Sequence, residues 1–227
     1  MEITSVLLHT TNIKDMREFY VEKLGFPLVN EDEHSFRIAT GSSELGFTSD
    51  GVEGNPYYHF AFNIPSNVFH EAKSWASERV ELSKEDGDDE AHFSFMRADA
   101  LYFSDPSGNI VEFIARKTSE EGVNPFSIHD IINISEIGLT VKDAISVGNE
   151  MIANGIYERF NKPLSSTSLN FMGDKDKGIF IILNQPGRRW IFSDKLSAVY
   201  PIEIKTSDHH RISINSKGQF EIGKHTN

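Results

Sequence analysis

The chain has 227 residues and a net charge of -12, and it carries no basic stripe, which argues against binding to nucleic acid or to an anionic membrane surface. Cysteine is absent, so disulfides, thiolate metal sites and cysteine nucleophiles are excluded. No apolar stretch is long enough to span a bilayer and the first residues lack the pattern of a secretory signal, so we expect a cytoplasmic protein.

The first 50 residues predict a strand, a helix and three more strands. Residues 3–11 alternate in a way that puts Ser5 and His9 on the face away from the core. Asn12 is expected to cap a helix that stops at Gly25. Turn residues separate the three strands that follow, at 28–30, 35–39 and 44–48.

The same order repeats over 51–117. A strand at 57–64 precedes a helix that opens at Pro65, and Asp105-Pro106-Ser107-Gly108 is a strong turn signal. The acidic run 85–90 is typical of a solvated loop. Strands are expected at 80–82, 91–96, 100–104 and 110–116.

A third copy begins near Ile134, with a helix capped by Asp143 and ended by Gly155. Its further strands are expected at 169–172 and 178–183, and the tail adds strands at 202–205, 211–214 and 218–222 without a helix. We therefore predict an α+β fold built from repeated βαβββ modules. Modules 1–50 and 51–117 are expected to pair into a cup, with a linker at 118–130 and a third, degenerate module plus C-terminal strands at 131–227.

Three polar side chains are predicted to point away from the helices, into that cup. His59 alternates with the apolar residues of its strand, and Glu112 and Glu44 do the same in theirs. If the first two modules pair edge to edge, these groups converge, and imidazole and carboxylate ligands together suit a divalent ion. The alternative is a wet cup in which they are merely solvated.

Three motifs resemble one known family. The segment Phe19-Tyr20-Val21-Glu22-Lys23-Leu24-Gly25-Phe26 resembles the helix signature of the vicinal oxygen chelate superfamily, which includes glyoxalase I, fosfomycin-resistance and bleomycin-resistance proteins and extradiol dioxygenases. Tyr58-His59-Phe60-Ala61-Phe62 resembles the opening of its second module. Asp105-Pro106-Ser107-Gly108-Asn109-Ile110-Val111-Glu112-Phe113 resembles its closing hairpin. The resemblance covers residues 3–116 and implies a cupped sheet of paired βαβββ modules.

The resemblance also implies metal positions in each module. His59, Glu112 and Glu44 match three of them, and Ser5 stands where metal-binding members have histidine. Serine is a poor ligand for these metals. His9 lies about 13 Å further along the strand, so we expect it to line the cavity instead.

The third module departs further from the family. Glu136 falls at its histidine position and Ile182 at its carboxylate position. Because an apolar residue cannot ligate, we interpret this module as structural, with any site lost, or as a wall for a partner.

The first functional hypothesis is an enzyme that uses a divalent ion, namely Zn, Ni, Mn, Co or Fe(II), to hold a small molecule with adjacent oxygens. Glu44 or Glu112 would then serve as general base. Isomerisation or lyase chemistry, nucleophile addition and ring cleavage all stay open. The side chains considered as substrate-lining, with ordinary polarity as their alternative explanation, are Ser5, His9, His92, Arg97 and Tyr102.

The second hypothesis is a metal-free protein that binds a drug or metabolite, as bleomycin-resistance proteins do. Ser5 at the histidine position favours it, as do 17 Phe, 6 Tyr and 2 Trp, which can line a cleft for a flat ligand. A scaffold without any small ligand is the third alternative. Two-module members of the family often dimerise to complete their cups, so the resemblance is compatible with a homodimer. The alternative is that the third module pairs within the chain with the tail strands.

Overall fold

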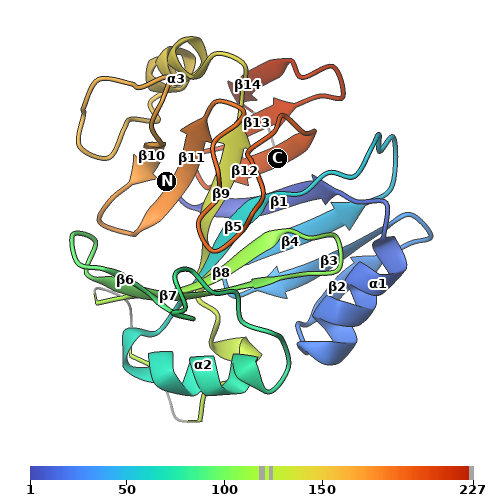
Figure 1. The fold of residues 1–227 in the computed structure, drawn as a ribbon. Coiled ribbons are helices and arrows are strands. Elements are labelled where there is room, and N and C mark those ends of the chain that lie inside the picture. The colour runs from blue at the N-terminus through green and yellow to red at the C-terminus, as the bar shows by residue number, and fades with distance from the viewer. Residues whose placement is uncertain (118–120, 123–124, 225–227) are drawn as a thin grey trace.

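The computed structural model describes residues 1–117, 121–122 and 125–224. Its strands form two mixed seven-stranded sheets, called sheet A and sheet B here (Figure 1). Sheet A has the order β14 (Phe220–Lys224), β13 (His210–Ile214), β12 (Ile202–Thr206), β1 (Ile3–His9), β4 (Ser43–Thr48), β3 (Ser35–Thr40), β2 (Leu28–Glu31). Sheet B has the order β10 (Asn170–Asp174), β11 (Ile179–Asn184), β9 (Asn133–Thr140), β5 (His59–Ile64), β8 (Ile110–Arg116), β7 (Ala98–Ser104), β6 (Ala91–Phe93).

Each of the three modules contributes one helix. α1 (Ile13–Arg17) continues as a π-helical segment (Glu18–Lys23) and ends before Gly25, whose φ of 81° suits glycine. A 3₁₀ turn (Ser66–Val68) leads into α2 (Phe69–Ser77). α3 (Ala144–Ala153) is capped as expected, because the Asp143 carboxylate accepts two backbone N–H groups. Asn12 does not cap α1; its side chain donates to the Pro106 carbonyl instead.

The modules pair differently from the prediction. β5 of the second module pairs antiparallel with β9 of the third, whereas β1 pairs antiparallel with β12 of the tail. Figure 1 shows the blue β1 beside the red tail strands, away from β8. The expected cup of modules 1–50 and 51–117 is therefore corrected to a cup made by the second and third modules. Alternation along a strand fixes which face is buried, but it does not say which edge becomes its neighbour.

One apolar core lies between the helix-facing sides of both sheets. Leu45 and Phe47 of sheet A belong to the same buried cluster as Phe60, Phe62 and the helical residues. Ser42 and Ser43 hydrogen-bond to the backbone that leads into β9, which joins the first module to the third. Side chains that alternate with this core, in either sheet, thus point away from the other sheet.

Two further expectations concern the connections. No regular strand forms at 80–82; Leu82 meets β7 only through one isolated bridge to Phe103. The linker predicted at 118–130 includes residues 118–120 and 123–124, and the third module and tail predicted at 131–227 include 225–227, which lie outside the described residues. Within the described ranges, no helix is both long and apolar enough to cross a bilayer.

Candidate metal centre

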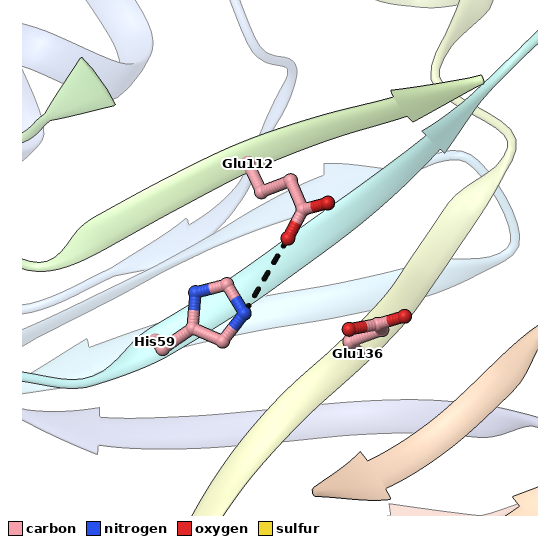
Figure 2. Close-up of side chains that lie close together, drawn as sticks. All are labelled: His59, Glu112 and Glu136. Carbon is pink, nitrogen blue, oxygen red and sulfur yellow. Dashed lines mark ion pairs between the residues drawn. The ribbon is translucent and has the colours of Figure 1, made fainter. Parts of the chain in front are cut away.

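Strand register brings three ligand-bearing side chains together on the concave face of sheet B. Ala61 of β5 lies opposite Glu112 of β8 on one side and opposite Glu136 of β9 on the other. His59 lies two residues before Ala61, on the same face of β5. One ligand atom from each of these three residues lies within 4.8 Å of the others. Figure 2 shows the three side chains directed into one space above β5.

His59 is oriented for ligation by its own hydrogen bond. Its Nδ1 lies 3.1 Å from the Ile110 carbonyl, so Nδ1 carries the proton and Nε2 keeps its lone pair. Nε2 is 3.4 Å from Glu112 Oε2 (Figure 2). Burial lowers the pKa of His59, so the imidazole is neutral and its contact with Glu112 is not an ion pair at neutral pH.

The surroundings of Glu112 oppose the charge of its carboxylate. Burial raises the pKa of Glu112 well above its ordinary value, and the neighbouring Glu136 raises it further. Arg116 and a hydrogen bond from Tyr102 oppose this rise. Without a cation, this environment favours the protonated form of Glu112, whose carboxyl lies in position to share a proton with His59 Nε2.

Arg116 already balances one of the two carboxylates. It forms a buried ion pair with Glu136 and also donates to Ser135 Oγ, at 3.2 Å. The pair fixes Glu136, and a cation bound here would compete with the proton that the raised pKa of Glu112 favours.

The three residues form the floor of a cavity of about 270 Å³. Its walls are largely aromatic and aliphatic, with two arginines and two carboxylates besides the imidazole. The wall residues include Tyr102, Met96, Phe95, Phe171 and Arg188. A wider polar hollow of about 690 Å³ lies beyond Arg116, and none of the three ligand residues lines it.

The segment 185–201 between β11 and β12, called the capping loop here, covers the cavity. Its Trp190 ring lies 4.9 Å from the His59 ring, and Phe192 stacks on Tyr102 at 4.5 Å. Arg189 forms an ion pair with Glu85, whose carboxylate also accepts the Phe192 N–H at 2.8 Å. The loop thereby shields the floor from solvent.

Glu44 lies elsewhere, which corrects the prediction that it joins this ligand set. It belongs to β4 of sheet A, where it pairs with Ser5 and alternates with the core residue Leu45. Its side chain thus points away from sheet B. Ser5 and His9 share that distant face, so they do not line the cavity either; Ser5 Oγ accepts a hydrogen bond from Arg37.

The predicted substrate-lining residues of the second module divide in two. Tyr102 lines the cavity and reaches Glu112. His92 is exposed and pairs with Asp99 on the other face of its hairpin. Arg97 lies in the turn of that hairpin, with a φ of 51°, and is exposed. Neither His92 nor Arg97 contributes to the cavity walls, because the strand alternation places Phe93 there instead.

Glu136 is the ligand residue that sequence reasoning passed over. It had been placed at the histidine position of the third module, and the register agrees: Glu136 pairs with Phe180 as His59 pairs with Ile110. Ile182 then corresponds to Glu112, and it lines the cavity. The second and third modules thus supply four equivalent positions, and three of them hold a residue with a metal-ligating side chain. The sequence does place Glu136 at the histidine position. Ile182 at the carboxylate position, however, argues against a site within the third module alone.

These residues fit a divalent metal. A neutral imidazole nitrogen with its other nitrogen tied to a carbonyl, plus two carboxylates, is a donor set used for Mn, Fe(II), Co, Ni or Zn. Ile182, at the fourth equivalent position, lines the cavity and offers no ligand atom, so water or substrate would complete the coordination of a bound ion.

Two families match parts of the chain. Residues 2–113 match the Glyoxalase/Bleomycin resistance protein/Dioxygenase superfamily. Residues 134–188, which include Glu136, match the family described as Toxoflavin-degrading enzyme. No curated protein matches the chain.

Solved structures are similar to parts of the chain. A candidate dioxygenase from Bacillus subtilis subsp. subtilis str. 168 is 17% identical, covers 81% of this chain and 63% of its own, and has a TM-score of 0.52. A glyoxalase family protein from Enterococcus faecalis is 26% identical over 50% of this chain and 96% of its own, with a TM-score of 0.41. Lactoylglutathione lyase from Agrobacterium tumefaciens is 17% identical over 50% of this chain and 92% of its own, with a TM-score of 0.41.

Proposed function

Because the chain belongs to the vicinal oxygen chelate superfamily, which contains the glyoxalases, bleomycin-resistance proteins and dioxygenases, we propose that it is a divalent-metal-dependent enzyme acting on a small flat molecule. The observation that carries this proposal is the buried group of His59, Glu112 and Glu136 beneath a cavity. Arg116 balances Glu136, but the second buried carboxylate beside it, Glu112, is costly to ionise without a further cation, which favours an ion between them.

The protein residues would hold the ion and handle one proton. A divalent ion at this site acts as a Lewis acid that polarises a carbonyl and stabilises negative charge on adjacent oxygens. His59 presents Nε2 without needing to lose a proton. Burial raises the pKa of Glu112, so this carboxyl group can take up or release a proton. The hydrogen bond from Tyr102 orients it. The capping loop keeps bulk water out.

The cavity walls indicate a planar substrate. Trp190, Tyr102 and Phe171 line it, and about 270 Å³ suits one or two fused rings. The match of residues 134–188 makes toxoflavin, a planar heteroaromatic compound, the first substrate to test.

One observation favours a metal-free binding protein as the second candidate. The Arg116–Glu136 ion pair neutralises one carboxylate without any metal, and Glu112 can be neutral by holding its proton. The aromatic cavity would then bind a flat ligand by area burial alone.

Metal content separates the two candidates. Protein purified without chelator is loaded separately with Mn²⁺, Fe²⁺, Co²⁺, Ni²⁺ and Zn²⁺, desalted and measured by inductively coupled plasma mass spectrometry. We expect near-stoichiometric retention of at least one ion in wild type and in the matched control Glu44→Gln. His59→Ala and Glu136→Gln should lose it.

Activity is measured on the same samples as the loss of toxoflavin absorbance. Metal-dependent turnover that disappears in His59→Ala supports the enzyme. Retention of no ion under any loading condition would contradict the enzyme and leave the binding protein.

A further inference from the structure

Arg159 lies beside the cavity with an incomplete set of hydrogen bonds. Its guanidinium carbon is 4.0 Å from the ring centroid of Phe171, so the two groups stack. Nη1 donates to Met96 Sδ at 3.2 Å, and the buried Nε has no hydrogen-bond partner. Burial lowers the pKa of Arg159. A buried donor without an acceptor costs free energy, which suggests that an acceptor arrives with a ligand.

Carboxylates attract the charge of Arg159 from longer range, but they do not contact it. Within residues 1–117, 121–122 and 125–224, no carboxylate lies within ion-pair distance of it, although the chain has 34 acidic residues against 22 basic ones. The two carboxylates that attract it from longer range, Glu136 and Glu158, have other hydrogen-bond partners. Glu136 pairs with Arg116, and Glu158 accepts the backbone N–H groups of Phe160 and Lys162.

Met96 separates Arg159 from the cavity. The same sulfur accepts from Arg159 and, at 3.9 Å, from Arg116, and Met96 lines the cavity together with Phe95 and Phe171. A thioether is a weak acceptor, whereas a carboxylate forms a charge-assisted bond with guanidinium. Met96 lies in the turn between β6 and β7, and its flexible side chain can move without breaking a strand.

We propose that Arg159 binds an anionic substituent of the ligand, which displaces the Met96 thioether, so that the cavity takes an aromatic compound bearing a carboxylate or phosphate. The ring would pack against Phe171, with its acidic end on the guanidinium. This inference uses the same cavity as the proposed function, but it does not require the metal.

Calorimetric titration of chelator-treated protein tests it independently of the metal. The probes are 2-naphthoate, its neutral counterpart 2-naphthamide, and 2-naphthyl phosphate, which distinguishes a carboxylate from a phosphate subsite. The variants are Arg159→Gln and Arg188→Gln, which tests the other candidate arginine. Arg188 lines the cavity, and among the described residues its guanidinium hydrogen-bonds to the Thr167 carbonyl at 3.5 Å.

We expect wild type and Arg188→Gln to bind at least one of the two anions about tenfold more tightly than 2-naphthamide, in line with one charge-assisted hydrogen bond. Arg159→Gln should bind that anion and the amide equally. Met96→Leu, which removes the competing acceptor, should bind the anion at least as tightly as wild type. Equal binding of acid and amide by wild type, no binding of any probe, or a preference lost in Arg188→Gln but kept in Arg159→Gln would overturn the assignment.

Discussion

Glu112 and Glu136 lie directly opposite Ala61 on the two strands that border β5, and the small side chain of Ala61 leaves room for their carboxylates to approach each other. Ala61→Val adds two methyl groups at this point. We expect it to abolish stoichiometric metal retention while lowering the unfolding free energy by about 1–3 kcal/mol. Ala115→Val, on the core face of β8, should cost similar stability and keep the metal. Equal metal retention in both variants would contradict this.

The Arg116–Glu136 pair allows a prediction about stability without metal. Glu136→Gln leaves the Arg116 charge buried without its carboxylate, and breaking such a pair costs about 3–5 kcal/mol. The double variant Arg116→Met/Glu136→Gln should recover much of that loss, because no uncompensated charge remains. Urea unfolding of the chelator-treated proteins measures both. A double variant no more stable than Glu136→Gln would show that the charge is not the cause.

Asp105 gives the protein a pH-dependent stability. Burial raises the pKa of its carboxyl from about 3.8 to about 6, although donors from Asn109 and Tyr20 oppose the rise. The folded state then binds the proton more tightly than the unfolded chain, so the unfolding free energy falls by up to about 3 kcal/mol as pH rises from 3.8 to 6.

Asp105→Asn removes this titration. The amide oxygen can keep the two backbone hydrogen bonds that Asp105 Oδ1 accepts, from Ser107 and Asn109. Urea unfolding at pH 4 and pH 7 should therefore show the variant gaining stability relative to wild type at the higher pH. A difference that is the same at both pH values would rule out Asp105 as the titrating group.

Most strands and all three helices follow from the sequence, because each is fixed by local alternation, capping or a glycine stop. The 3.6-residue pattern before Gly25 and the Asp143 cap are local signals, and both elements form where expected. The pairing of β5 with β9 is a choice between distant edges, so the sequence predicted the modules but not the cup.

The candidate site divides in the same way. His59 and Glu112 belong to one module, and their shared face follows from strand alternation. Glu136 joins the site because β9 pairs with β5, which are distant in the sequence. Glu44 does not join it, because β4 pairs with β1 in sheet A. Trp190 and Phe192 belong to a loop without helical or strand periodicity, so the sequence pattern does not predict that they cover the cavity.

The ion pair between Glu85 and Arg189 should control the capping loop. Glu85→Ala removes the acceptor of both the Arg189 guanidinium and the Phe192 N–H. Because the pair is partly exposed, we expect the unfolding free energy to change by less than about 1 kcal/mol. Hydrogen exchange at the Phe192 amide should nevertheless accelerate, as read by mass spectrometry of the peptide that contains it. Unchanged exchange there would mean that the stacking on Tyr102 holds the loop by itself.

The central claim is that one divalent ion binds between His59, Glu112 and Glu136. Crystals of Mn²⁺-loaded protein, with diffraction recorded on both sides of the manganese absorption edge, test it most directly. The account predicts a single strong anomalous peak within coordination distance of His59 Nε2 and both carboxylates. A strong peak at another place would contradict it. So would the absence of a peak at this site when protein from dissolved crystals contains stoichiometric manganese.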